Sequence, residues 1–150
     1  MIRIHRTTSA DPDFVALVRE LDAELAARDG EEHGFYAQFN KIDRIRHALV
    51  AYEEGRPIGC GAIKELEAGV LEIKRMYVSP DQRRKGIAAL ILAELESWAG
   101  ELSADRCVLE TGKRQPEAIA LYRRSGFRQI PNYGQYAGVE NSVCFEKGLK

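Results

Sequence analysis

Two periods of apolar residues divide this 150-residue sequence into strands and helices. Apolar and polar residues alternate over several short segments, which indicates strands with one buried face. Elsewhere apolar residues recur every three or four positions, which indicates helices with one buried face. The alternation predicts strands over residues 2–6, 48–52, 57–66, 70–78, 106–111, 127–130 and 142–147, and the longer period predicts helices over residues 14–29, 84–102 and 116–125.

The segment between the first helix and the second strand has no clear period. It carries three aromatic residues, Phe35, Tyr36 and Phe39, among polar and small ones over residues 31–45. These side chains fit the wall of a substrate pocket, and packing over the sheet explains them as well. We expect a short helix or an ordered loop here, with both interpretations open.

The order of the elements predicts a mixed sheet packed with helices. Residues 48–78 form a meander of three antiparallel strands, because each connection is short and contains glycine. Residues 72–110 then run strand, helix, strand, and such a crossover makes the two strands parallel neighbours. The fold class is therefore α/β (α+β), with a parallel pair near the middle of the sheet, in a single domain over residues 1–150. Ligands favour the ends of strands where neighbours diverge, which here is beside Val78 and Glu110.

A basic segment follows the third strand of the meander. Residues 79–81, Ser-Pro-Asp, supply turn and capping side chains, and a helix is expected to begin near Arg84. The cations of residues 83–85, Arg-Arg-Lys, would then lie where the helix dipole already presents positive charge, so they would be unfavourable without a bound anion. Gly86 lets the backbone approach a ligand and Ala88 leaves room, which suits phosphate oxygens. A solvated basic helix start is the alternative, and these residues alone leave both open.

Composition and charge exclude several classes of protein. With 45% apolar residues and a net charge of −1, the chain fits one compact domain and does not fit a general nucleic-acid binder. No segment approaches the roughly 20 apolar residues that span a membrane, so we expect a soluble cytoplasmic protein. Cys60, Cys107 and Cys144 are widely spaced and odd in number. Neither a disulfide framework nor a metal site is indicated, and we expect buried thiols.

Two short motifs give the chain a family resemblance. The motif R-x-x-G-x-A over residues 83–88 follows a strand that ends at residues 76–78, and A-I-A-L-Y over residues 118–122 is followed by Gly126 and Phe127. Together they resemble the signatures of the GNAT acetyltransferase superfamily, and the resemblance covers nearly the whole chain. It implies a GNAT-like fold, with a mostly antiparallel sheet, a central parallel pair and helices on both faces. It also implies acetyl-CoA as the acetyl donor and an amine as the acceptor, without a metal.

The resemblance implies roles for individual residues as well. The amides of residues 83–88 would hold the coenzyme A pyrophosphate, and the backbone of Met76 and Val78 would pair with the pantetheine arm. Gln115 stands where many relatives have an asparagine that contacts the cofactor. The residues implied in cofactor binding are Met76, Tyr77, Val78, Arg83, Arg84, Lys85, Gly86, Ile87, Ala88, Gln115 and Tyr122.

Acetyl transfer to an amine needs a base and a donor that stabilises charge on the thioester oxygen. Glu72 matches a strand position where some relatives place a general base, and a strand-edge carboxylate paired with Lys74 or Arg75 is the alternative. The Val78 amide is the expected oxyanion donor, because a strand splayed from its neighbour has unpaired amides. Tyr122 matches a tyrosine near the thioester sulfur that could protonate or hydrogen-bond the departing thiolate, and a core tyrosine of an amphipathic helix is the alternative.

We therefore expect an N-acetyltransferase that acts on the primary amine of a small molecule or an amino-acid-like acceptor, by direct attack in a ternary complex. A protein or peptide acetyltransferase would share the donor site and differ only in the acceptor groove, expected over residues 31–45 and 131–141. A non-catalytic acyl-CoA-binding module is a third interpretation. An RNA-binding domain is disfavoured by the near-neutral charge. Relatives are commonly monomers or dimers, so we expect a monomer or a homodimer.

Overall fold

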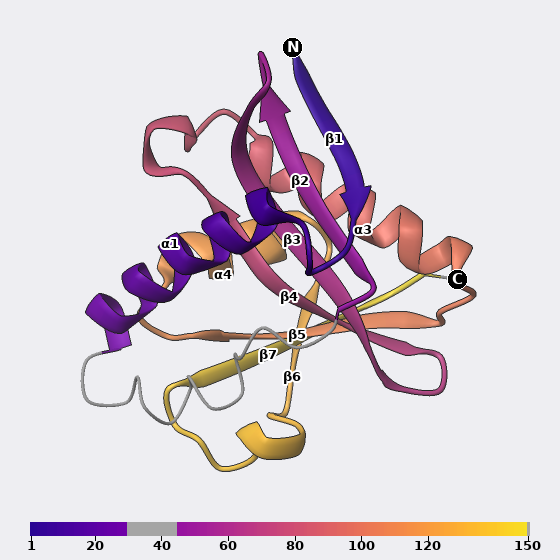
Figure 1. Cartoon of the computed structure of the whole chain (residues 1–150). Coiled ribbons are helices and arrows are strands. Elements are labelled where there is room, and N and C mark those ends of the chain that lie inside the picture. The colour runs from indigo at the N-terminus through magenta and orange to yellow at the C-terminus, as the bar shows by residue number, and fades with distance from the viewer. Residues whose placement is uncertain (30–44, 150) are drawn as a thin grey trace.

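The computed structural model describes residues 1–29 and 45–149, which form a seven-stranded sheet with helices on both faces (Figure 1). The strands are β1 Ile2–Thr7, β2 His47–Glu53, β3 Arg56–Glu67, β4 Val70–Val78, β5 Arg106–Gly112, β6 Arg128–Ile130 and β7 Ser142–Gly148. Among the described residues, the helices are α1 Pro12–Asp29, α3 Ile87–Glu101 and α4 Pro116–Arg124, with the short 3-10 turns η2 Pro80–Gln82 and η3 Gly134–Tyr136. The spatial order of the strands is β1-β2-β3-β4-β5-β7-β6, and the β4–β5 pair is parallel whereas the others are antiparallel. The predicted mixed sheet with a central parallel pair is thereby confirmed.

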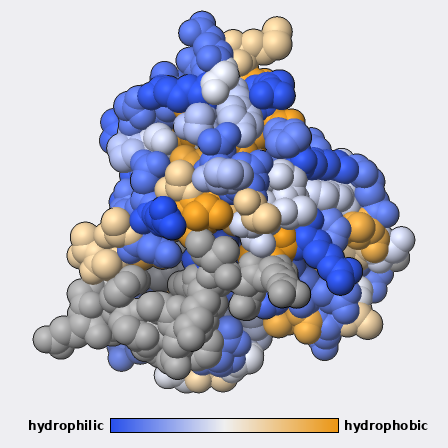
Figure 2. All heavy atoms as spheres, in the orientation of Figure 1, coloured by the Kyte–Doolittle hydropathy of each residue, from blue (hydrophilic) through white to orange (hydrophobic). Residues whose placement is uncertain are grey.

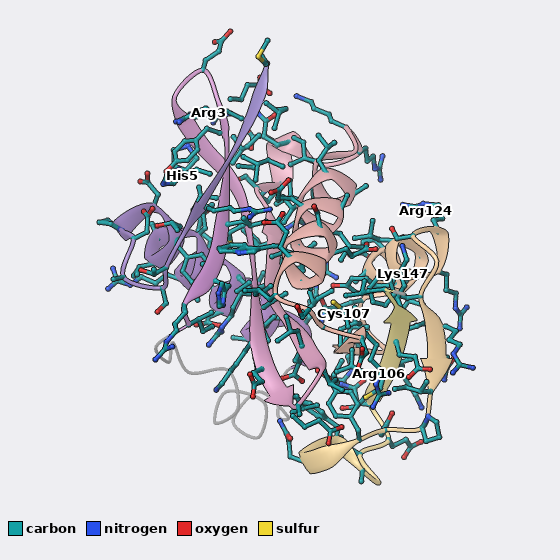
Figure 3. The ribbon with its side chains drawn as sticks, turned by 90° about the vertical axis from the view of Figure 1, so that its right-hand side faces the viewer. Arg3, His5, Arg106, Cys107, Arg124 and Lys147 are labelled. Atoms are coloured by element: carbon teal, nitrogen blue, oxygen red, sulfur yellow. The ribbon has the colours of Figure 1, made fainter. Side chains whose placement is uncertain are left out.

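Each face of the sheet has its own apolar core. Helix α1 covers one face, and α3 and α4 cover the other, as Figures 1 and 3 show from two directions. Phe14 and Leu17 of α1 pack on the first face, and Ile91 and Leu95 of α3 pack on the second. All four side chains are at most 2% exposed, and the outer surface drawn in Figure 2 is mostly hydrophilic. The middle of the sheet is therefore accessible chiefly where neighbouring strands separate.

Strands β4 and β5 separate soon after they begin. Their parallel register runs only from Val70 opposite Arg106 to Glu72 opposite Val108, although β4 continues to Val78. The second half of β4 consequently has β3 on one side and a gap on the other. A gap of this kind exposes strand amides that would otherwise pair in the sheet.

A β-bulge bends β4 shortly after its last pair with β5. Gly61 of β3 stands opposite two residues of β4, Arg75 and Met76. The backbone of Arg75 has a φ of 61°, in the left-handed region. Because a bulge turns its strand and redirects the following side chains, β4 leads away from β5 after this point.

Gly61 is required by the close approach of α3 to the bulge. A Cβ atom at this position would lie 2.9 Å from side-chain atoms of Ile91, Leu95 and Met76. We expect Gly61→Ala to lower the free energy of unfolding by about 1–3 kcal/mol, as overpacking of a core does. The control is Gly100→Ala in α3, where a Cβ would meet nothing within 4 Å. This variant should gain about 0.5–1 kcal/mol from helix propensity. Urea unfolding of both variants checks the pair, and equal stabilities would contradict the packing described here.

Helix α3 begins at Ile87, whereas the sequence predicted a start near Arg84. Arg84 and Gly86 have φ values of 66° and 78°, which a right-handed helix cannot accommodate. Residues 79–81 do not cap α3, because they belong to the separate turn η2. The basic residues 83–85 therefore precede the helix instead of forming its first turn.

Other expectations have mixed outcomes. Leu90 and Leu102, which fit the apolar period of the sequence, are 48% and 43% exposed, because the buried side of α3 follows steps of four residues from Ile87.

Apart from the buried Ile45, the predicted loop or helix of residues 31–45, with its three aromatic residues, lies outside the described residues. Within the residues that are described, the helices are too short or too polar to cross a membrane. The three cysteines are buried free thiols, as predicted: Cys60, Cys107 and Cys144.

Candidate active site

A cavity of about 610 Å³ lies in the gap between β4 and β5. Its wall includes Leu21 and Leu25 of α1, on one face of the sheet, and Ile87 of α3 and Leu121 of α4, on the other. The cavity therefore runs through the sheet from one helical layer to the other. The sequence-predicted site residues that line it are Glu72, Met76, Tyr77, Val78, Arg83, Arg84, Gly86, Ile87, Ala88, Gln115 and Tyr122. Lys85 does not line the cavity; its ammonium group donates a hydrogen bond to Gln82 Oε1 at 3.1 Å.

The amino end of α3 presents backbone amides at the cavity. The first helical hydrogen bond of α3 runs from the Leu90 amide to the Gly86 carbonyl, at 3.1 Å. The amides of residues 87–89 precede it and have no intrahelical acceptor. Among the described residues, no side chain caps this end, and a Cβ at Gly86 would meet nothing within 4 Å. Amides at a helix start, beside open space, suit the oxygens of a phosphate group.

Arg83 is held by the protein itself. Its guanidinium donates one hydrogen bond to Glu24 Oε1 of α1 at 2.7 Å and another to the Val78 carbonyl at 2.9 Å. It also lies over the Tyr77 ring, 5.5 Å from the centroid. The expectation that the three cations lack a negative partner unless an anion binds is therefore wrong for Arg83, because Glu24 balances its charge.

Tyr77 and Gln115 reach the cavity in different ways. The Tyr77 side chain belongs to the apolar core under α1, and its hydroxyl lies 3.5 Å from Glu20 Oε1. Gln115 precedes the first residue of α4, and its carbonyl accepts the Ala118 amide at 3.1 Å. Gln115 therefore combines a structural role at the start of α4 with its place in the cavity wall.

The Val78 amide faces the gap. The next amide along the strand, that of Ser79, donates to the Ile58 carbonyl of β3 at 2.8 Å. Successive amides of a strand point to opposite edges, so the amide of Val78 points away from β3 and toward diverging β5. This orientation leaves a backbone donor directed into the cavity.

Glu72 lies inside the sheet and not at a strand edge, because β4 runs between β3 and β5. Its side chain lies on the α1 face, since its neighbours Leu71 and Ile73 belong to the core under α3. Oε2 accepts a hydrogen bond from the Tyr133 hydroxyl at 2.6 Å. Oε1 lies 3.7 Å from the Lys74 ammonium, a loose ion pair. Arg75, the other expected partner, pairs with Asp22 of α1 instead, at 3.4 Å.

Tyr122 is both a core residue and part of the cavity wall. It is 6% exposed and contacts Phe127 edge-on, with 5.9 Å between ring centroids. Burial, and then the negative charge of Glu110, raise the pKa of the Tyr122 hydroxyl above its usual value. The hydroxyl is therefore protonated at neutral pH and can act as a donor.

Sequence reasoning missed side chains that reach the site from distant segments: Tyr136 and Glu24 line the cavity, whereas Tyr133 contacts Glu72. Tyr133 and Tyr136 come from the connection between β6 and β7, and Glu24 comes from α1. Glu110 on β5 joins Glu72 on the α1 face, and both carboxylates raise the pKa of Tyr136 beyond the effect of its burial. The tyrosine content of residues 131–140 was the available signal in the sequence. Within the described part of the chain, no three His, Cys, Asp or Glu side chains gather as a metal site requires.

Comparisons with known proteins agree with this geometry. A family model described as the acetyltransferase (GNAT) family matches residues 14–127. An IAA acetyltransferase of Azospirillum brasilense is 34% identical over 151 residues, which cover 99% of this chain and 98% of that protein. The crystal structure of an acyl-CoA N-acyltransferase from Klebsiella pneumoniae matches with a TM-score of 0.84 and 31% identity, covering 100% of this chain and 99% of the other. A PaiA N-acetyltransferase from Thermoplasma acidophilum, solved with coenzyme A, shares the fold with a TM-score of 0.73 at 17% identity and 99% coverage of both chains. We conclude that this chain belongs to the acetyltransferase (GNAT) family of enzymes.

Proposed function

We propose that this enzyme transfers an acetyl group from acetyl-CoA to the primary amine of a small molecule or an amino-acid-like acceptor. The observation that carries the proposal is the cavity that runs through the sheet between β4 and β5. Amides and open space lie on its α3 side, and carboxylates lie on its α1 side. Two substrates can thus meet from opposite faces, which suits direct attack in a ternary complex.

The donor half of the cavity would hold the coenzyme A moiety. The amides at the start of α3 would bind the pyrophosphate, and Gly86 leaves the space that these oxygens need. The backbone of Met76 and Val78, on the free edge of β4, would pair with the pantetheine arm. The structural relative from Thermoplasma acidophilum was solved in complex with coenzyme A, which supports a donor of this class.

The reaction requires three groups of the protein. Glu72 takes a proton from the ammonium group of the acceptor, directly or through a water molecule, and frees the nitrogen lone pair. The nitrogen bonds to the thioester carbon while the Val78 amide stabilises the negative charge that develops on the thioester oxygen. The carbon–sulfur bond then breaks, and Tyr122 donates its hydroxyl proton to the departing thiolate. The second proton of the nitrogen passes through water to the tyrosinate, which leaves a neutral amide and restores Tyr122, and Glu72 releases its proton to solvent.

An assay with a panel of amines tests this proposal. Free thiol is followed with acetyl-CoA and, in turn, small amines, free amino acids and short peptides with free amino termini. Turnover on one or more small amines is expected. Turnover on peptides alone would favour a protein or peptide acetyltransferase. Binding of acetyl-CoA without turnover on any amine would favour a non-catalytic binding module.

The further predictions of cytoplasmic localisation and of a monomer or homodimer belong to the same proposal, and cell fractionation and gel filtration test them.

Removal of the Tyr122 hydroxyl should slow turnover moderately. A thiolate is a good leaving group because thiols ionise near pH 8.5, so its protonation contributes less than deprotonation of the amine. We expect Tyr122→Phe to lower kcat about tenfold while the KM for acetyl-CoA stays within about twofold of wild type. Tyr52→Phe is the control, because Tyr52 donates a hydrogen bond to Asp13 at 2.6 Å and does not line the cavity. A Tyr122→Phe variant with wild-type kcat would remove Tyr122 from the mechanism.

A further inference from the structure

We propose that Tyr133 is a positioning residue for Glu72, whose hydroxyl holds the carboxylate in the orientation that accepts a proton from the acceptor amine. The proposal rests on the proposed function, because it takes Glu72 as the base. It assigns a part in the reaction to the connection between β6 and β7, which the motifs at residues 83–88 and 118–122 do not include.

The contact between the two side chains is short, and it joins Glu72, which lines the cavity, to Tyr133, which does not. The Tyr133 hydroxyl donates to Glu72 Oε2 at 2.6 Å, across 61 residues of sequence. A hydrogen bond to an ionised acceptor at this distance belongs to the strong class. Glu72 itself is 6% exposed, so few water molecules compete with the tyrosine.

The two oxygens of Glu72 have different surroundings. Oε2 accepts the Tyr133 hydroxyl, whereas the neighbour of Oε1 among the residues that the structure describes is the Lys74 ammonium at 3.7 Å. With one oxygen anchored, rotation of the carboxylate group is restricted. Oε1 is then the oxygen available to receive the proton of an incoming amine.

Tyr133 keeps its role as a donor over the working range of pH. Burial, followed by the negative charge of Glu72, raises the pKa of the Tyr133 hydroxyl far above its usual value. The hydroxyl therefore carries its proton at neutral and mildly alkaline pH. The direction of the hydrogen bond, from tyrosine to carboxylate, does not change.

The segment that carries Tyr133 is itself fixed. The Asn132 side-chain amide donates to the carbonyls of Val139 and Ser142, each at 3.0 Å, and so closes the connection on itself. The Tyr136 amide donates to the Tyr133 carbonyl at 2.9 Å, and the two rings meet edge-on with centroids 5.9 Å apart. A hydroxyl on so well-supported a segment can position a base before the acceptor arrives.

A double-mutant cycle tests the proposal. The kcat of Tyr133→Phe is compared with that of wild type, and the kcat of Glu72→Gln/Tyr133→Phe with that of Glu72→Gln, using acetyl-CoA and the amine of the panel with the highest turnover. If Tyr133 acts through Glu72, its loss should lower kcat about five- to tenfold in the first pair and less than about twofold in the second. The KM for acetyl-CoA should be unchanged. The same loss in both backgrounds would indicate a merely structural role and overturn the proposal.

A spectroscopic arm works without any acceptor and separates this proposal from the proposed function. In protein with 13C at the hydroxyl-bearing ring carbon of tyrosine, the Tyr133 resonance is assigned by its loss in Tyr133→Phe. It should move in Glu72→Gln and stay in place in Tyr52→Phe, whose lost hydroxyl belongs to a tyrosine–carboxylate pair of the same 2.6 Å length. If the position of the Tyr133 resonance is unchanged in Glu72→Gln, the positioning role is overturned even if the enzyme acetylates amines. Absence of turnover on every amine, with a resonance that responds to Glu72→Gln, contradicts the proposed function and with it the catalytic part of Tyr133, while the hydrogen bond between Tyr133 and Glu72 stands.

Discussion

Replacement of Glu72 by glutamine is expected to lower kcat by about 10²- to 10⁴-fold, the range that general-base catalysis contributes. Glutamine keeps the size of the side chain and an oxygen that can accept the Tyr133 hydroxyl, but it cannot take a proton from an ammonium group. Because Glu72 lies on the α1 face, opposite the start of α3, binding of acetyl-CoA should be unaffected. Initial rates with the best amine of the panel, together with the thermal shift produced by acetyl-CoA, measure the two effects separately.

The control for this variant is Glu65→Gln, which removes an exposed carboxylate of the neighbouring strand β3. It should leave both kcat and the thermal shift at wild-type values. Wild-type turnover in Glu72→Gln would show that the carboxylate is a structural partner of Lys74 and Tyr133 and not the base. Loss of the thermal shift would instead show that Glu72 contributes to binding of the donor.

Replacement of Gly86 by glutamate should abolish binding of acetyl-CoA. A side chain at this position enters the open space before the start of α3, where the pyrophosphate is proposed to lie, and adds a negative charge there. Acetyl-CoA at about 100 times its Kd should stabilise the wild-type enzyme by about 2.7 kcal/mol, which raises its melting temperature by several degrees. We expect the same concentration to produce no shift in Gly86→Glu.

Gly55 provides a matched control for the strain that this substitution introduces. Gly55 and Gly86 have φ values of 80° and 78°, and a Cβ at either would meet nothing within 4 Å. Both glutamate variants should therefore lose about 1–2 kcal/mol of stability from the left-handed backbone alone. Only Gly86→Glu should lose the response to acetyl-CoA, because Gly55 lies in the turn between β2 and β3, away from the cavity. An undiminished shift in Gly86→Glu would contradict the assignment of the donor site.

The pattern of apolar residues predicted most of the strands and helices, because an element that buries one face carries its apolar residues at a characteristic local period. Strand β4 has the predicted bounds, and α4 begins at Pro116 as expected. The start of α3 was placed too early because residues 83–85 fit a helix in composition, whereas positive φ values at Arg84 and Gly86 exclude them from one. Glycine at position 86 suits a left-handed backbone, whereas the residue type of Arg84 gives no sign of one.

The candidate site was predictable where it follows a motif and not where it depends on distant contacts. Residues 83–88 and Tyr122 could be selected because they belong to short continuous patterns, and all of them except Lys85 line the cavity. The partner of Arg83 is Glu24, 59 residues away, and the partner of Glu72 is Tyr133, 61 residues away. No local period or spacing links such pairs. The ion pair of Arg83 and the hydrogen bond to Glu72, the proposed base, could therefore be identified only from the folded structure.

The most direct measurement is the ratio of acetylated amine to free thiol in one reaction, with the amine product identified by mass spectrometry. If acetyl-CoA and an amine meet in the cavity between β4 and β5, N-acetylated amine and thiol should form in equal amounts with the wild-type enzyme. Both should fall together in Glu72→Gln. Thiol release without an acetylated amine, or equal product formation in wild type and Gly86→Glu, would contradict acetyl transfer in this cavity.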